Sequence, residues 1–191
     1  EEVLEEVEKD REFYEESGGG ITLSGGEVLQ QHAFAVELLK EAQSRGLHCA
    51  AETTGYASHE VFREFVEYID LLLFDMKHWD REKHFEKTGV YNDMILENMG
   101  YAVSQGIPLI ARIPVIPKFN ASLKDAAGMA ENLCKLGIRE VHLLPFHQFG
   151  EKKYEQLETE YEMSGVPQLH PEQLQKYIQV FLDRGLDASF K

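Results

Sequence analysis

Residues 70–78 read DLLLFDMKH, in which a run of apolar side chains is followed at once by an acid and a base. The apolar run, Leu71 to Phe74, shows no alternation with polar residues, which is typical of a strand buried on both faces of a parallel sheet. Asp75 and Lys77 are two positions apart and would therefore point to the same side of an extended chain. The stretch predicts a central parallel strand that presents a carboxylate and an ammonium where it ends.

The rest of the chain repeats this unit, because short apolar runs rich in β-branched residues alternate with longer segments of helical periodicity. The expected strands cover residues 21–24, 47–52, 70–74, 109–115 and 141–144, with 188–190 as a further edge strand. The expected helices cover residues 1–17, 29–45, 91–105 and 171–184, with two more that begin after Ser58 and Ser122. This alternation predicts an α/β fold with a parallel sheet and right-handed crossovers.

The number of units limits the architecture. Around five β/α units are visible, whereas a closed (β/α) barrel of the TIM type has eight. We therefore expect a single domain over residues 1–191, a partial, open TIM-type barrel whose first strand pairs with an element outside this chain. The chain begins at Glu1 without Met, and a crossover helix with no strand before it indicates a fragment cut just after strand one.

Composition narrows the classes of partner. With a formal net charge of -15 the chain would repel phosphate backbones and anionic lipid, so neither nucleic acid nor a membrane is expected. No apolar stretch is long enough to cross a bilayer, and nothing at the start resembles a signal peptide. Cys49 and Cys134 make neither a disulfide framework nor a metal cluster and are expected to be buried. These features indicate a cytoplasmic protein.

Three further expectations concern burial and loops. The spacing within residues 29–45 predicts one buried stripe, made of Phe34, Leu38, Leu39 and Ala42. His78 and His84 lie in a polar segment and are expected to be solvated. Residues 148–169 form a long irregular segment, which in a compact domain is typical of a functional loop.

Polar and glycine residues follow each expected strand. In chain order they are Ser24-Gly25-Gly26-Glu27, Glu52-Thr53-Thr54-Gly55, Asp75-Met76-Lys77-His78, Arg112 and Pro145-Phe146-His147. Because the carboxyl ends of parallel strands meet on one side of a barrel, these groups are expected to share one mouth. The glycine turn exposes backbone groups and the side chains offer both charge signs, so the mouth suits an amphoteric ligand with an ammonium, a carboxylate and a ribose.

Each of these residues also has a purely structural interpretation. Glu27 could be an acid favoured in the first turn of a helix, and Asp75 with Lys77 could be an ion pair. Arg112 could anchor a nearby carboxylate, and a histidine such as His147 is more often structural than catalytic. The whole set of strand ends, rather than any single residue, favours a ligand site.

Several motifs occur in a fixed order along the chain: GGGITLSGGEVLQQ (18–31), AETTGY (51–56), LLFDMKH (72–78), ARIPVIPKFN (111–120), LLPFHQFGEKKYEQL (143–157) and EYEMSGV (160–166). This series resembles the activating enzymes of glycyl radical enzymes, the group that includes the pyruvate formate-lyase activating enzyme within the radical S-adenosylmethionine superfamily. The resemblance covers essentially the whole chain, and the ordered series is far more specific than its GGE element alone.

The resemblance implies a role for each strand-end residue. The residues that would line the methionine end of S-adenosylmethionine are Ser24, Gly25, Gly26 and Glu27. Those near its sulfonium and ribose would be Glu52, Thr53, Asp75 and Lys77. Arg112 would contact a carboxylate or the ribose and His147 would close the site, with Lys77 and His147 as the catalytic residues. The resemblance also implies a monovalent cation held by oxygens of Glu52, Thr53 and Asp75.

The activity implied by the resemblance needs a group that this sequence cannot hold. The family reduces S-adenosylmethionine with a four-iron four-sulfur cluster on a C-x-x-x-C-x-x-C motif, which is absent here. The 5'-deoxyadenosyl radical then abstracts hydrogen from a glycine of a partner similar to pyruvate formate-lyase, and a flavodoxin or ferredoxin-type protein donates the electron. The chain alone is therefore expected to be inactive, with the cluster ligands upstream of Glu1.

Two other interpretations stay open. On the same architecture, an aldolase- or isomerase-like enzyme could use Lys77 as a base or Schiff-base amine. Alternatively, a cluster-free relative could bind S-adenosylmethionine as a regulatory module. Trapping of a substrate on Lys77 by borohydride would favour the first, and a start codon at Glu1 would favour the second.

Overall fold

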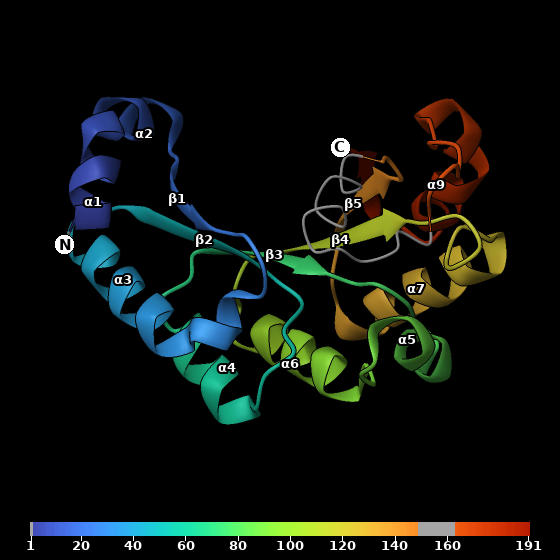
Figure 1. Ribbon diagram of the computed structural model, residues 1–191, viewed down its shortest axis with the longest axis horizontal. Coiled ribbons are helices and arrows are strands. Elements are labelled where there is room, and N and C mark those ends of the chain that lie inside the picture. Colours follow the sequence, from blue (N-terminus) through green and yellow to red (C-terminus); the bar gives the residue numbers. More distant parts are fainter. Residues whose placement is uncertain (1, 149–162) are drawn as a thin grey trace.

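The architecture is a curved parallel sheet with helices along one of its faces (Figure 1). A computed structural model describes residues 2–148 and 163–191. Its six strands stand side by side in sequence order, and all neighbours are parallel: β1 (Gly20–Leu23), β2 (His48–Thr53), β3 (Leu71–Asp75), β4 (Leu109–Val115), β5 (Glu140–Pro145) and β6 (Asp187–Phe190). Strands in this order form the wall of a (β/α) barrel, and six of them leave the wall open. The predicted partial barrel is confirmed.

The helices fill the connections between the strands. Before β1 lie α1 (Glu2–Val7), η1 (Glu8–Asp10) and α2 (Arg11–Ser17), and after it lie η2 (Val28–Gln31) and α3 (His32–Ser44). The later connections contain α4 (His59–Val66), α5 (Arg81–Thr88), α6 (Asp93–Ser104), α7 (Leu123–Leu136), η3 (Pro171–Leu174) and α9 (Gln175–Leu182). Figure 1 shows α3 to α7 along one face of the sheet, and among the described residues no helix covers the opposite face of β2 to β4.

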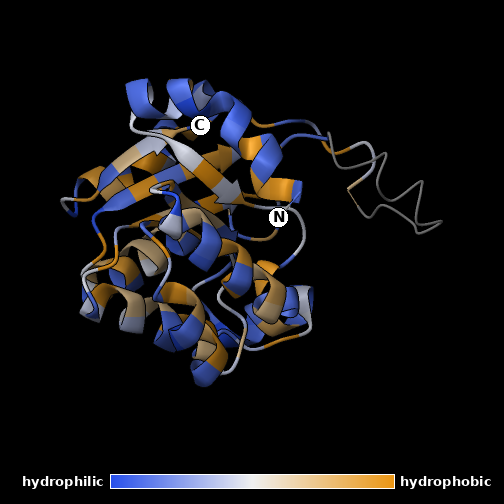
Figure 2. Ribbon diagram, turned by 90° about the vertical axis from the view of Figure 1, so that its left-hand side faces the viewer, coloured by the Kyte–Doolittle hydropathy of each residue, from blue (hydrophilic) through white to orange (hydrophobic). Residues whose placement is uncertain are grey.

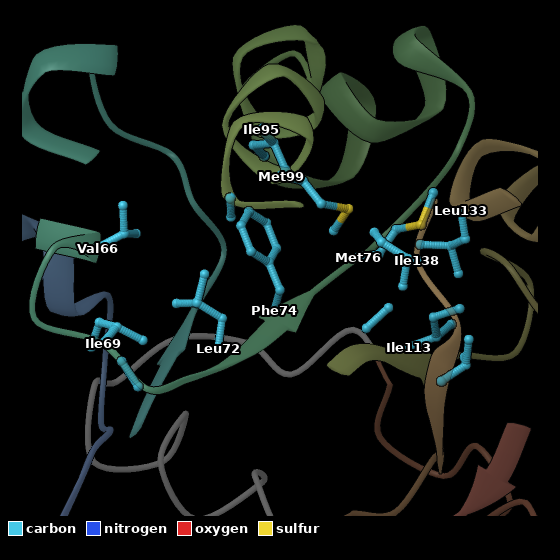
Figure 3. Packing of buried hydrophobic residues seen from close by; sticks show 14 of the residues in the cluster. Val66, Ile69, Leu72, Phe74, Met76, Ile95, Met99, Ile113, Leu133 and Ile138 are labelled. Atoms are coloured by element: carbon cyan, nitrogen blue, oxygen red, sulfur yellow. The ribbon is translucent and has the colours of Figure 1, made fainter. Parts of the chain in front are cut away.

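The hydrophobic core lies between the sheet and these helices. Leu72, Phe74 and Met76 alternate along β3 and just beyond it and are all buried. Figure 3 shows Phe74 pointing toward Met99 and Ile95 of α6, and Met76 beside Leu133 and Ile138. Leu71 and Leu73, on the other face, are only half-buried. The expectation that β3 is buried on both faces is therefore wrong, because the helices that the structure describes pack on only one of them.

Side-chain caps explain where several helices begin. The Ser58 hydroxyl accepts from the Val61 N–H (3.4 Å) and starts α4, as predicted. The Ser122 hydroxyl accepts from the Asp125 N–H (3.1 Å) and starts α7, also as predicted. Gly137 ends α7 with φ 80°, a left-handed conformation that glycine adopts without steric cost.

Three expectations about burial are wrong. Phe34 is 60% exposed, because α3 turns Ala35, Leu39 and Ala42 toward the sheet instead. His78 and His84 are 1% and 2% exposed rather than solvated. His84 lies on α5, a helix that the sequence pattern missed because His84 is its only buried residue.

The two cysteines differ in their exposure to solvent. Cys134 is exposed, contrary to expectation, whereas Cys49 is buried as predicted. Figure 2 shows orange and blue segments alternating along the helices, as expected of amphipathic helices packed on a core. No helix in the described ranges is long and apolar enough to cross a membrane. Most of the predicted loop, residues 149–162, lies outside the described residues.

Candidate functional site

The turn that follows β1 forms part of the wall of a cavity. A Cβ added at Gly25 or Gly26 would meet nothing within 4 Å, so the backbone of this turn is open to an approaching ligand. Gly25 also has φ 126°, a conformation that favours glycine. The cavity has a volume of ≈ 460 Å³, within the range of small-molecule sites, and its lining includes Ser24, Gly26, Glu27, Phe34 and Leu38.

Glu27 ties this turn to the loop after β2. Its Oε1 accepts hydrogen bonds from the Thr53 hydroxyl (2.6 Å) and the Leu29 N–H (3.2 Å). Its Oε2 accepts from the hydroxyl and the N–H of Thr54, at 2.5 and 2.8 Å. Donors of the chain thus use the four acceptor positions of a carboxylate. The bond to Leu29 caps η2, in agreement with the structural interpretation of Glu27.

Five polar side chains make a continuous series of contacts across the ends of β1 to β4. The Ser24 hydroxyl donates to Glu52 Oε2 (2.7 Å), and Arg112 Nη1 donates to Glu52 Oε1. Arg112 Nε lies 3.9 Å from Asp75 Oδ1, and Asp75 Oδ2 accepts from Lys77 Nζ at 2.7 Å. The charged members are 21% to 36% exposed, so solvent and ligands can reach them.

The register of the sheet explains why these side chains meet. Asp75 and Arg112 are direct partners of the β3–β4 ladder. Glu52 pairs with Leu73 of β3, and alternation along the strand puts Leu73 and Asp75 on the same face. The Arg112 side chain therefore reaches across β3 to β2, on the face that the described helices leave uncovered. The strand ends bring together, as expected, Ser24, Glu52, Asp75, Lys77 and Arg112.

The network holds two negative and two positive charges. The Ser24 hydroxyl is the main cause that lowers the pKa of Glu52; hydrogen bonding and charge from Arg112 add to it, and partial burial opposes both. Glu52 is therefore an anion at neutral pH. A ligand that carries both charge signs can exchange partners with such a network without leaving a buried charge unpaired.

The remaining predicted residues lie at the same edge of the sheet. Thr53 is 3% exposed, and its hydroxyl also accepts from the Gly55 N–H at 2.9 Å. It therefore braces the loop rather than facing solvent. His147 lies two residues beyond the end of β5 and is exposed.

Two residues of this region have no role in the sequence-based prediction. Thr54 supplies two of the donors to Glu27, which only the folded loop reveals. His142 is the register partner of Arg112 on β5, and its Nε2 lies 3.3 Å from Glu140 Oε1. Strand register depends on tertiary pairing, so the order of polar and apolar residues along β5 could not predict that His142 lies beside Arg112.

The cysteines do not form a metal-binding group. Cys49 is buried on β2, and burial, with a smaller effect of Asp70, raises the pKa of its thiol to about 11. Cys134 is exposed on α7. Across the described ranges, no three histidine, cysteine or acidic side chains come together as a metal site. An iron–sulfur cluster needs several thiolates, so these residues do not fit one.

Comparison with known proteins gives consistent matches. The chain is 41% identical over 179 residues to the choline trimethylamine-lyase activating enzyme of Oleidesulfovibrio alaskensis, covering 92% of this chain and 58% of that protein. It is 40% identical over 187 residues to the 4-hydroxyphenylacetate decarboxylase activating enzyme of Clostridioides difficile, covering 97% of this chain and 59% of that protein. The chain thus spans less than two thirds of these relatives. No protein-family model matches it.

A solved structure matches the fold over nearly the same span. It is the crystal structure of a domain of the pyruvate-formate lyase-activating enzyme of Bacteroides vulgatus, with a TM-score of 0.74 and 31% sequence identity. The match covers 91% of this chain and 99% of that domain. Sequence and fold therefore point to the same group of proteins.

Proposed function

Since this chain belongs to the family of glycyl radical enzyme activating enzymes, in the radical S-adenosylmethionine superfamily, we propose that it is the S-adenosylmethionine-binding body of such an enzyme. The observation that carries the proposal is the half-buried, charge-balanced network beside the open glycine turn. Residues 1–191 would form one domain of a longer protein, because the chain spans 58% and 59% of the two curated relatives.

The chemistry of the donor set fits S-adenosylmethionine. This molecule carries an ammonium, a carboxylate, a sulfonium and a ribose, so it needs anions, cations and hydrogen-bonding groups close together. Glu52 and Asp75 offer anions, and Arg112 offers a fork of donors suited to a carboxylate. The turn at Gly25 and Gly26 offers open backbone groups for the methionine end.

The proposed roles are those that the family resemblance implies. Ser24, Gly25 and Gly26 line the methionine end, while Glu27 holds their turn in place. The residues assigned to the sulfonium and ribose are Glu52, Thr53, Asp75 and Lys77. Arg112 takes a carboxylate or the ribose and His147 closes the site, with Lys77 and His147 as the catalytic residues. When bound beside a reduced iron–sulfur cluster, S-adenosylmethionine supplies hydrogen-abstracting chemistry, and this chain binds, orients and shields it.

The proposal includes two further groups, an iron–sulfur cluster and a monovalent cation. We place the proposed cluster on residues outside these 191, because Cys49 and Cys134 do not fit it. A monovalent cation on oxygens of Glu52, Thr53 and Asp75 is also proposed. Arg112 bridges the two carboxylates, so such a cation would have to displace its guanidinium.

The partner proposed for the whole protein is a glycyl radical enzyme. The relatives are named for a lyase and a decarboxylase that they activate, and the charged network at the strand ends is partly exposed. A flavodoxin or ferredoxin-type protein would supply the electron, and the setting would be the cytoplasm. Nucleic acid and membranes are not proposed as partners, given the net charge of -15.

Calorimetric titration of S-adenosylmethionine into the full-length protein tests the proposal. Arg112→Gln should weaken binding at least about tenfold, because a charged fork of donors is lost. Arg63→Gln is the matched control, since Arg63 stacks over Tyr101 on the helix-covered side and should leave affinity unchanged. Equal affinity of Arg112→Gln and the unmodified protein would overturn the proposed site. Borohydride trapping of a carbonyl substrate on Lys77 would instead favour the aldolase-like alternative.

A further inference from the structure

The segment after β3 carries Lys77 and is held firmly although it belongs to no helix or strand. The Met76 N–H donates to the Arg112 carbonyl (2.8 Å), and the Lys77 carbonyl accepts from Asn120 Nδ2 (2.8 Å). The next two carbonyls, those of His78 and Trp79, accept from the side-chain amide of Asn92 at 3.0 and 3.2 Å. Four consecutive residues are thus tied through their backbone.

The β3–β4 ladder ends just before Lys77 for a chemical reason. The Leu72 N–H donates to the Pro108 carbonyl (2.9 Å) and the Met76 N–H to the Arg112 carbonyl, so the even-numbered residues of β4 face β3. The next residue of β4 to face β3 is Pro114, which has no N–H. The ladder therefore cannot continue, and the chain that leads to Lys77 loses its backbone partner.

Asn120 takes over where the ladder stops. One side-chain amide donates both to the Lys77 carbonyl and to the Pro114 carbonyl, each at 2.8 Å. Its Oδ1 accepts from the Ile116 N–H at 2.7 Å. The amide thus acts as one extra rung between the end of β3 and β4, at the level where Lys77 leaves the sheet.

Asn120 is itself fixed in place. It is 0% exposed, and its carbonyl accepts from the Tyr177 hydroxyl (3.0 Å) of α9. Tyr177 is 2% exposed, so this bond lies in the core. A buried amide held by three hydrogen bonds has little freedom to move, and removal of its donors takes a partner from two part-buried carbonyls.

We propose that Asn120 is the positioning residue for Lys77: its amide sets the place of the Lys77 backbone and, through it, the Lys77–Asp75 ion pair of the site. This inference rests on the proposed function only for the identity of the ligand. We call the two hydrogen bonds from the Asn120 amide to the Lys77 and Pro114 carbonyls the clamp. It is a feature of the polypeptide and can be tested without ligand.

Asn98 provides a matched control. It is also 0% exposed, and its side-chain amide also donates to two loop carbonyls, those of Gly55 (2.8 Å) and Ala57 (2.9 Å). Those carbonyls belong to the loop after β2, on the other side of β3 from Asn120. The same substitution can therefore be made in the same chemistry without touching the Lys77 segment.

The experiment is a double-mutant cycle in the full-length protein, read as affinity for S-adenosylmethionine. Asn120→Asp keeps the acceptor and removes the donors, and it should weaken binding about tenfold in the parent but less than about twofold in a Lys77→Met background. Asn98→Asp should cost the same factor in both backgrounds. An equal loss for Asn120→Asp in both backgrounds would mean that Asn120 does not act through Lys77.

Hydrogen exchange without ligand separates this inference from the proposed function. In Asn120→Asp the Met76 amide should exchange at least about tenfold faster, while the Ala111 and Ile113 amides, which face β5, keep their rates. Unchanged exchange at Met76 overturns the clamp whatever the ligand is. Faster exchange at Met76 in Asn120→Asp, combined with no binding of S-adenosylmethionine by the unmodified protein, supports the clamp and overturns the proposed function. If Asn120→Asp does not fold, Tyr177→Phe, which removes one bond to Asn120, should give a smaller effect in the same direction.

Discussion

Glu27 accepts hydrogen bonds from three residues, and all of its acceptor positions serve the chain. A carboxylate used in this way cannot also bind an ammonium without giving up a bond that holds the turn. Its contribution to ligand binding is then indirect, because it fixes the backbone of Gly25 and Gly26. The same carboxylate joins β1 to β2 beyond the end of their ladder, which stops at Leu23 and Ala51.

Replacement of Glu27 by glutamine tests this role. The amide nitrogen of Glu27→Gln would face two donors of Thr54, so the free energy of unfolding should fall by about 1–2 kcal/mol. Chemical denaturation measures this change. Glu37→Gln is the control, because Glu37 is 76% exposed in a surface pair with Lys40 and should change stability by less than about 0.5 kcal/mol. Equal stabilities of the two variants would contradict the assigned role.

His78 makes stability depend on pH. Burial is the main cause that lowers its pKa below 6.5; Lys83 adds to this effect, and Asp125 and Asp80 oppose it. Its Nδ1 accepts from the Asp80 N–H (2.9 Å), so the folded protein holds the neutral ring. Below about pH 6.5 the unfolded chain binds the proton first, and folding stability must fall as the pH is lowered through the window down to the folded pKa.

The corresponding measurement compares two chains at two pH values. Unfolding free energies at about pH 7.5 and about pH 5.5 should differ more for the parent than for His78→Gln, which cannot titrate in this range. The residual pH dependence of His78→Gln then reports all other groups. The same pH dependence in both chains would show that His78 is not held neutral.

Some of the helices and strands could be predicted from the sequence and others could not. The strands and most helices were predictable, because apolar runs and helical spacing report burial directly. The helix α5 was not, since its contact with the core comes from the imidazole of His84, which hydrogen-bonds to the Val90 carbonyl (2.8 Å) and Thr88. The strand ends predicted which residues gather at the mouth, but Asn120 lies outside them and its partners depend on tertiary packing.

Two helical glycines give a matched test of element packing. A Cβ on Gly128 of α7 would lie 2.3 Å from Trp79 Cδ2, so Gly128→Ala should destabilise the protein by about 1–3 kcal/mol. A Cβ on Gly100 of α6 meets only the end of Leu136 at 3.2 Å, and Gly100→Ala should be neutral or stabilising by less than about 1 kcal/mol. Thermal unfolding measures the melting temperatures of both variants, and that of Gly128→Ala should be clearly lower. Similar melting temperatures would show that Trp79 moves aside easily.

At the scale of the whole molecule, one face of the sheet builds the core and the other carries the charged network. Phe74 and Met76 are buried under the helices, while Asp75 and Arg112, which are register partners, belong to the opposite face, which none of the described helices covers. Changes on the network face therefore remove few core contacts. Stability and ligand binding are expected to respond to largely separate sets of substitutions.

Iron binding tests the proposal that the cluster ligands lie outside these 191 residues. Anaerobic reconstitution of these 191 residues with iron and sulfide should leave less than about one iron atom per chain after desalting, because Cys49 is buried and Cys134 stands alone on α7. Iron analysis and visible absorbance read the result. The full-length protein treated in parallel is expected to take up a cluster. A stable cluster on the 191 residues would refute that proposal.

Pro114 has a consequence for how the protein can vary. Because this residue has no N–H to donate toward β3, the β3–β4 pairing ends at Asp75 and Arg112, and Asn120 donates to the Pro114 carbonyl instead. Any other amino acid at this position would have a backbone N–H, which could donate to the Met76 carbonyl and extend the β3–β4 ladder by one hydrogen bond. A substitution at residue 114 would therefore change the backbone where β3 ends without changing any side chain of the charged network.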